Sequence, residues 1–201
     1  MRQNLQYVSP KDILKLIVSK DNVMEYVNNL EPRDDGLLTG YTDGDFYQTH
    51  PFFQQYPKAF QLVLYYDDLE VVNKQETKYQ IHTIAAFYLM ILNVPPHMNS
   101  TLSSIHVVAL VNYNDLKTLG CRAVLQPLLN DLTELESDEG VHVVVSERHR
   151  ILRASLVAFI GDTQAGHQIF QFLAAGARHF CRLCMISRQQ LHMGHIVFGE
   201  R

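Results

Sequence analysis

The sequence has few cysteines, no long hydrophobic run and no excess of positive charge. Only three of its 201 residues are Cys, too few for a disulfide framework, and the pair Cys181-x-x-Cys184 suits a reducing compartment. The first residues lack the apolar core of a signal peptide, and the most hydrophobic run, Ile84–Val94, covers about half of the ~20 residues that span a bilayer. We therefore expect a soluble protein of the nucleus or cytoplasm with no membrane partner.

Basic residues are outnumbered. The chain has 17 Lys and Arg against 21 Asp and Glu, a formal net charge of −4 and a pI of about 6.2. A protein whose whole surface binds nucleic acid is usually basic, so this balance counts against a stand-alone DNA-binding protein. The G-x-S-x-G, Walker A and G-x-G-x-x-G motifs are also absent, and Gly161–Gly166 lacks a phosphate-binding lysine. Nucleophilic hydrolysis and nucleotide binding are therefore poorly supported.

What the sequence does contain is the composition of a globular protein. Hydrophobic residues make up 47% and charged residues 19%, which excludes wholesale disorder and coiled coil. A chain of this length buries roughly 70% of the surface that it exposes when unfolded, so folding requires no disulfide or metal.

The pattern predicts a small N-terminal helical extension and then an α/β domain with a mixed sheet. Ser9 can cap a helix that begins at Pro10, Asp12 completes a capping box, and apolar residues keep helical spacing to about Leu30. Strands are expected at 60–66, 81–92, 105–111, 141–145 and 152–160, and helices at 116–135 and 164–177. The run Ile105–Val111 is rich in β-branched residues, as is typical of a strand that is buried on both faces.

Two of the predicted strands lead into acidic residues. The first is followed by Asp67 and Asp68, and the last by Asp162. Strand ends are where an α/β sheet exposes its site, and two carboxylates from neighbouring strands suit Mg²⁺ or Mn²⁺. Such ions can activate an attacking oxygen and stabilise a leaving one in phosphodiester chemistry. Alternatively, these acids are turn residues, and Asp162 caps the next helix.

Asp67 and Asp68 are alternatives to each other. Successive strand residues face opposite sides of a sheet, so the two carboxylates cannot both point into one pocket. Asp67 is preferred because it lies nearer the strand body. Glu70 is a further candidate ligand, with a solvated loop charge as the alternative.

A second group of candidate ligands lies near the C-terminus. Cys181 and Cys184 can coordinate one Zn²⁺, and His192 and His195 would complete a tetrahedral site. The two His are separated by two residues, where about three to five are usual. A reduced structural pair of cysteines, or half of an incomplete site, is the alternative. A thioredoxin-like role is disfavoured because the pair follows a predicted helix instead of opening one.

Five motifs in order resemble the core of CACTA-type DDE transposases. They are Asn93-Val94-Pro95-Pro96, Leu125-Gln126-Pro127-Leu128-Leu129-Asn130-Asp131-Leu132, Gly140-Val141, Arg153-Ala154-Ser155-Leu156 leading to Gly161-Asp162, and Phe180-Cys181-Arg182-Leu183-Cys184. The resemblance covers about 60–191. It implies an RNase H-like fold and metal-dependent cutting and joining of DNA, with Asp67 or Asp68 as the first acid and Asp162 as the second. It also implies that Cys181 and Cys184 begin an inserted zinc-binding segment.

The chain departs from that family in two respects. The family's third acid lies well beyond the cysteine pair, where this sequence offers only Glu200, and Asn73-Lys74-Gln75 replaces the usual Asn-Pro-Gly. We therefore expect a transposase-derived protein, truncated before the third acid and catalytically incomplete. Its expected parts are an extension (1–57), an incomplete RNase H-like core (58–180) and a cysteine segment (181–201).

Two functions without catalysis remain open. One is a protein-binding module, or a homo-oligomer, that uses the exposed sheet and the N-terminal helix. The other is a zinc-stabilised nuclear module that contacts DNA through Arg178, Arg182 and Arg188, although a solvated helix face explains these arginines equally well.

Overall fold

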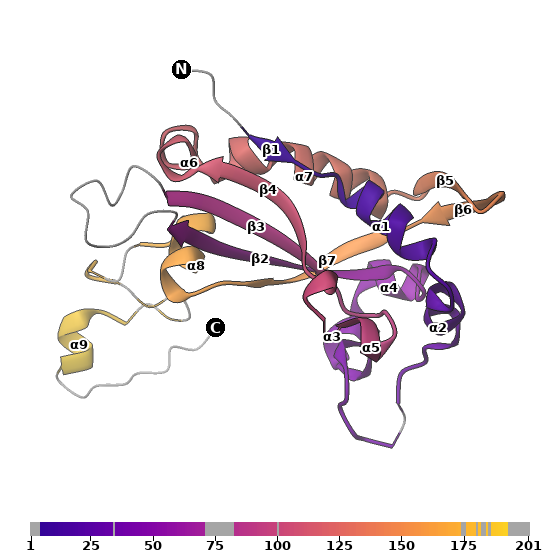
Figure 1. The fold of residues 1–201 in the computed structure, drawn as a ribbon. Coiled ribbons are helices and arrows are strands. Elements are labelled where there is room, and N and C mark those ends of the chain that lie inside the picture. The colour runs from indigo at the N-terminus through magenta and orange to yellow at the C-terminus, as the bar shows by residue number, and fades with distance from the viewer. Residues whose placement is uncertain are drawn as a thin grey trace. The chain divides into compact units, whose positions relative to one another are not determined.

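The computed structural model of the protein describes residues 5–33, 35–70, 83–99, 101–173, 176–179, 181, 184 and 186–192, the last of these by its backbone alone. The chain divides into two compact units, Met1–Phe159 and Ile160–Arg201. The positions of the chain's parts relative to one another are not determined (Figure 1). Residues 1–57 belong to the same compact unit as the sheet.

The first unit is built on a five-stranded sheet in the order β1-β4-β3-β2-β7 (Figure 1). Its strands are β1 (Gln6–Tyr7), β2 (Phe60–Glu70), β3 (Thr83–Ile91), β4 (His106–Asn112) and β7 (Ala154–Ile160). The pairs β1–β4, β4–β3 and β3–β2 are antiparallel. The sheet is mixed, so β7 runs parallel to β2, and Phe60 N donates to the carbonyl oxygen of Arg153 at 2.8 Å where both strands begin. The predicted α/β fold with a mixed sheet is confirmed.

Helices and short 3₁₀ turns surround this sheet. The helices of the first unit are α1 (Pro10–Val18), α2 (Val23–Asn29), α3 (Asp45–Thr49), α4 (Pro51–Gln55), α5 (Pro96–Asn99), α6 (Tyr113–Leu119) and α7 (Cys121–Glu136), with 3₁₀ turns η1 (Tyr41–Asp43) and η3 (Leu102–Ser104). The second unit contains α8 (Thr163–Ile169) and α9 (Arg188–His192). Within the described residues, no helix is long and apolar enough to cross a membrane.

One face of the sheet is buried along β3 and the first part of β2. Alternate residues of β3, among them Phe87 and Leu89, are 0% exposed, and α7 buries one apolar stripe that includes Val124, Leu128 and Leu135. Helix α1 packs against α7 through Leu14 and its neighbours. Burial of this kind contributes about 25 cal/mol per Å² and is the main stabilising contribution in the fold.

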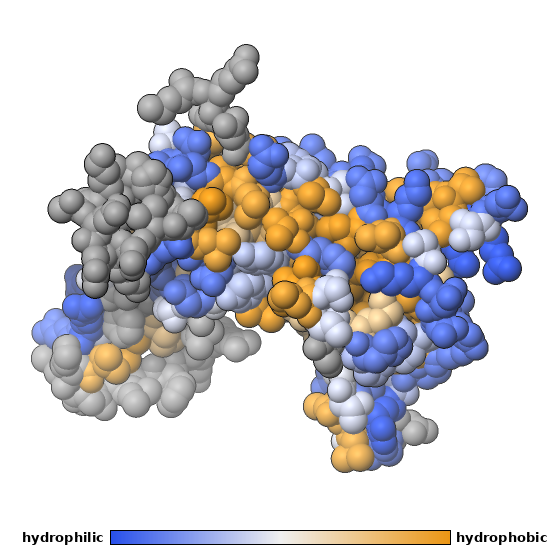
Figure 2. Space-filling view, viewed as in Figure 1, coloured by the Kyte–Doolittle hydropathy of each residue, from blue (hydrophilic) through white to orange (hydrophobic). Residues whose placement is uncertain are grey.

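The opposite face is covered only in part. At the start of β2, Gln61 Nε2 donates to Thr42 Oγ1 at 3.2 Å, and an aromatic cluster around Tyr47 and Phe53 packs there. Further along, Tyr65 and Tyr88 are half-buried, and Val107 of β4 is 39% exposed. The prediction that 105–111 is buried on both faces is therefore wrong. Apolar side chains gather over the central strands in Figure 2.

Three predicted helices differ from those observed, each at a left-handed residue. The first ends at Val18 and resumes at Val23, because Asn22 has φ 65°. The helix predicted at 116–135 is two helices, α6 and α7, separated by Gly120 at φ 80°. The last ends at Ile169, and Gln171 then has φ 56°, so the prediction to residue 177 is wrong. A left-handed residue cannot continue a right-handed helix.

A β-hairpin was not foreseen. Strand β5 (Val141–Val145) lies where it was predicted, but β6 (Arg148–Leu152) pairs with it as a separate two-stranded sheet, and the following strand begins at Ala154. The turn residues Ser146 and Glu147 have φ 48° and 62°. Such turns normally carry Asn-Gly or Asp-Gly, so this sequence lacks the usual hairpin signature.

We expect Gly140→Ala to destabilise the first unit strongly. Gly140 has φ +64°, and an added Cβ would lie 2.7 Å from Ile151 Cγ2 and 3.0 Å from the carbonyl oxygen of Leu152. The control is Gly36→Ala, where φ is +77° and nothing lies within 4 Å. Thermal or urea unfolding should show a loss of about 1 kcal/mol for the control and about 3 kcal/mol for Gly140→Ala. Equal losses would contradict the close packing at Gly140.

Candidate functional site

Asp67 and Asp68 lie inside β2, not after it. The strand continues to Glu70, and the two aspartates pair with Ala86 and Ala85 of β3. The prediction that the strand ends at Tyr66 is therefore wrong. Pairing with β3 extends the strand through residues that have little strand propensity of their own.

The two carboxylates lie on opposite faces of the sheet, as alternation requires. Asp67 is exposed and accepts a hydrogen bond of 3.4 Å from Tyr65 Oη. Asp68 is half-buried and accepts one of 2.5 Å from Tyr66 Oη. Each tyrosine lies two residues before the aspartate that it bonds, so the two side chains are on the same face of the sheet. The choice between the two as first acid stays open.

The surroundings of the two acids differ. Burial raises the pKa of Tyr66, and the hydrogen bond to Asp68 raises it further, so this hydroxyl remains a donor that fixes the Asp68 carboxylate. Within the described residues, Asp67 forms no ion pair with a Lys or Arg, and its Oδ1 accepts the backbone N–H of Asp68. Carboxylate oxygens of this kind fit Mg²⁺ or Mn²⁺ chemically.

Asp162 caps α8 in the second unit. Its Oδ1 accepts the N–H of Ala165 at 2.6 Å, so the alternative that it is a helix cap is confirmed. A capping carboxylate keeps a second oxygen, so this role does not exclude metal binding. The pairing of Asp162 with Asp67 or Asp68 stays a prediction.

The zinc prediction is also untested. Cys181 is half-buried and Cys184 exposed, and neither forms a disulfide. The side chain of His192 and the whole of His195 lie outside the described residues, among which no group of three or more His, Cys, Asp or Glu could hold a metal. Of the three arginines proposed to contact DNA, Arg182 lies outside the described residues, while Arg188 N donates to the carbonyl oxygen of Arg178 at 2.9 Å.

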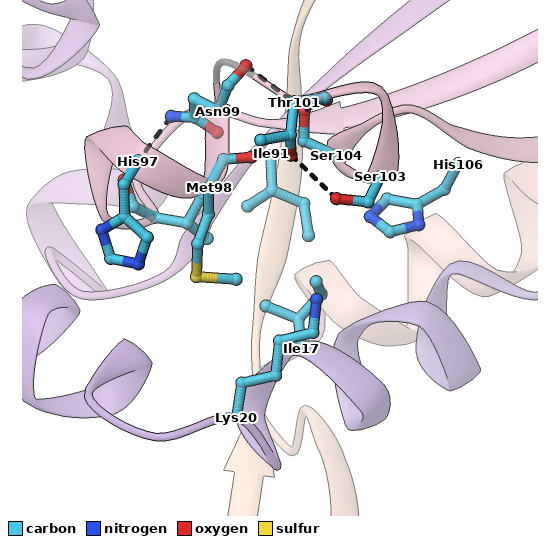
Figure 3. Close-up of a pocket in the computed structure, with 11 residues that line it drawn as sticks. Ile17, Lys20, Ile91, His97, Met98, Asn99, Thr101, Ser103, Ser104 and His106 are labelled. Atoms are coloured by element: carbon cyan, nitrogen blue, oxygen red, sulfur yellow. Dashed lines mark hydrogen bonds between the residues drawn. The ribbon is translucent and has the colours of Figure 1, made fainter.

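The structure places two histidines at one cavity that their spacing in the sequence does not connect. His97 on α5 and His106 at the start of β4 line one cavity of about 220 Å³ together with Lys20, which follows α1 (Figure 3). Eight residues separate the two histidines in sequence, so no short ligand motif could have identified the pair.

Another missed group centres on Asp131 of α7. Its carboxylate accepts hydrogen bonds from Tyr7 Oη at 2.7 Å and Ser9 Oγ at 2.5 Å and forms an ion pair with Lys11 Nζ at 2.7 Å. Burial alone would raise the pKa of Asp131, but the bonds from Lys11, Ser9 and Tyr7 lower it below its usual value. This group joins the N-terminal segment to α7.

Comparison of the sequence with models of protein families finds no match. A search of curated proteins finds none either.

Proposed function

We propose that this protein is a transposase-derived, RNase H-like domain, related to enzymes that cut and join DNA strands with Mg²⁺ or Mn²⁺. In this proposal, Asp67 or Asp68 is the first acid and Asp162 the second. This assignment leaves the third acid of the resemblance without a residue.

The observation that carries this proposal is the position of β7 beside β2. The first acids lie near the carboxyl end of β2, and Asp162 follows β7 by two residues. Parallel neighbours end at the same edge of a sheet, which is where α/β proteins bring together ligands from different strands. The antiparallel strands β2, β3 and β4 are followed by α6, α7 and the β5–β6 hairpin before the chain enters β7, and this arrangement supports the RNase H-like interpretation.

The chemistry of these acids supports a divalent cation. Carboxylates are hard oxygen donors, which favour Mg²⁺ and Mn²⁺ over softer metals. Bound there, such an ion would supply Lewis-acid activation of a phosphodiester. The chain's own contribution is to hold the carboxylates: β2 fixes Asp67 and Asp68, Tyr66 orients Asp68, and α8 orients Asp162.

Metal-dependent stabilisation tests the proposal. We expect Mn²⁺ to raise the melting temperature of the protein, and Asp162→Asn to abolish the increase, because a carboxamide keeps the capping oxygen but loses the charge. Asp138→Asn, an exposed carboxylate of the first unit that bonds Gln55 and Tyr56, is the control and should keep the Mn²⁺ response.

The same experiment separates Asp67 from Asp68. Whichever of Asp67→Asn and Asp68→Asn abolishes the rise in melting temperature with Mn²⁺ identifies the first acid. An unchanged Mn²⁺ response in Asp162→Asn and in both β2 variants would contradict the metal site. Nicking of DNA by the purified protein, lost in Asp162→Asn, would show instead a complete enzyme.

A binding module is the second candidate. It is favoured by the half-exposed sheet face, where Tyr65 and Tyr88 rings lie 5.9 Å apart and Val107 and Leu69 are each 39% exposed. Apolar surface of this kind marks an interaction site. Light scattering that shows a monomer without hydrophobic-dye binding would count against this candidate.

A further inference from the structure

The cavity between the end of α1 and the segment from α5 to β4 has an apolar floor and a basic rim. Ile17, Ile91 and Val94 form the floor and are each at most 4% exposed. Lys20, His97 and His106 are the ionisable side chains among the described lining residues, which include no Asp or Glu. Figure 3 shows Lys20 reaching up from the end of α1 toward the loop that carries Thr101 and His106.

These three basic side chains have no partner in the described part of the chain. No hydrogen bond or ion pair engages the side chain of Lys20, His97 or His106 there, whereas the side chains of Lys11 and Lys58 both pair with carboxylates. The proximity of Lys20 also disfavours a charge on His106: burial lowers the pKa of His106, and the Lys20 ammonium lowers it further. The Lys20 ammonium, with no Asp or Glu among the described lining residues, leaves a local excess of positive potential.

The hydroxyl groups at the rim of the cavity form hydrogen bonds within the loop that carries them. Ser104 Oγ donates to the carbonyl oxygens of Asn99 and Thr101 at 3.2 and 2.5 Å, and Thr101 Oγ1 contacts both Ser103 Oγ and the carbonyl oxygen of Met98. These bonds fix the loop that positions His106. The donors that remain for a ligand are therefore those of Lys20 and the two histidines.

We propose that this cavity binds a phosphate-type oxyanion, held by Lys20 and His106, with His97 at the other side of the same cavity. Lys is a common point-charge ligand of phosphate, and imidazole donates an N–H from each protonated nitrogen. The volume of about 220 Å³ exceeds the roughly 30 Å³ that one water occupies in the liquid, so it admits a tetrahedral oxyanion with some of its water. The site is separate from Asp67, Asp68 and Asp162 and does not depend on the proposed metal chemistry.

Titration with inorganic phosphate, at constant ionic strength with chloride as reference, tests the proposal. Proton NMR should show saturable shifts of the His97 and His106 ring signals, assigned with His97→Gln and His106→Gln. We expect Lys20→Gln to weaken phosphate binding about tenfold, which is the effect of losing one charged hydrogen bond. Lys15→Gln removes the same charge from an exposed position of α1 outside the cavity and should bind phosphate like the unaltered protein.

Two further measurements sharpen the test. Sulfate stays a dianion between about pH 7.5 and about pH 5.5, so tighter sulfate binding at the lower pH would report protonation of His106 beside Lys20. Competition by glycerol phosphate would identify a small phosphate ester as the source of the oxyanion, and competition by a short DNA duplex would identify a nucleic-acid backbone. Shifts that do not saturate, or equal affinities in Lys20→Gln and Lys15→Gln, would overturn the proposal and would leave the Mn²⁺ experiment unaffected.

Discussion

Asp131→Ala should destabilise the first unit by about 3 kcal/mol, because it removes a buried acceptor and leaves three half-buried donors without it. Asp131 is 8% exposed and receives the Tyr7 hydroxyl, the Ser9 hydroxyl and the Lys11 ammonium. At this chain length the loss corresponds to a fall in melting temperature of roughly 6–12 °C. Differential scanning calorimetry would measure it.

Glu134→Ala is the matched control for Asp131→Ala. Glu134 lies one helical turn further along α7 and bonds the same Lys11 Nζ at 2.9 Å, but its side chain is 59% exposed. An exposed ion pair contributes about 0–1 kcal/mol. Losses of similar size in the two variants would contradict the central role of Asp131.

The contribution of Asp131 should also depend on pH. Its folded-state pKa is lowered, so the stabilisation is present above the unfolded value of about 3.9 and is lost as the pH falls through the folded value. The difference in stability between the unaltered protein and Asp131→Asn should therefore shrink below about pH 4.

The sheet was predictable because its strands are local hydrophobic runs. Three of its five strands, β3, β4 and β7, begin and end within two residues of their predicted bounds, and β2 begins where it was predicted but continues four residues past its predicted end. The remaining strand, β1, has only two residues and exists through its pairing with Leu110 and Ala109 of β4. No local sequence pattern predicts a strand of two residues.

The candidate site was predictable only in part. Alternation along β2 placed Asp67 and Asp68 on opposite faces, as observed through Tyr65 and Tyr66. Their position inside the strand was not foreseen, because it depends on pairing with Ala85 and Ala86, which are distant in sequence. The Lys20 cavity likewise joins two segments that are distant in sequence, 17–20 and 91–106, which only the folded chain brings together.

Several residues of the five motifs have structural roles. Gly140 adopts a left-handed conformation in a crowded position, and Asp131 holds the N-terminal segment. Arg153 donates to the carbonyl oxygen of Asp138 at 2.5 Å and lies over the Tyr56 ring at 4.3 Å. These motifs therefore bear more directly on the fold than on catalysis, since each position has a packing or hydrogen-bonding reason of its own.

Asn93, the first residue of the first motif, gives the second large prediction. Its Oδ1 accepts the N–H of Gln61 at 2.9 Å, and its Nδ2 donates to the carbonyl oxygen of Ala59 at 2.9 Å. All three residues are at most 4% exposed. Asn93→Ala leaves a backbone donor and a backbone acceptor buried without partners, at about 1–3 kcal/mol each, so we expect a total loss of about 3 kcal/mol in urea unfolding.

Asn99→Ala is the control for Asn93→Ala, since half-buried Asn99 also bonds the backbone near the end of β3, through Nδ2 to the carbonyl oxygen of Leu92 at 2.9 Å. Water can replace that bond more readily, so we expect a loss of about 1 kcal/mol. An equal loss in both variants would contradict a special role for Asn93. Asn93→Ala is expected to lose stability, whereas Asp162→Asn is expected to keep its stability and to lose only the response to Mn²⁺. That result would assign Asn93 to the stability of the fold and Asp162 to metal binding. The two parts of the transposase resemblance can then be judged separately.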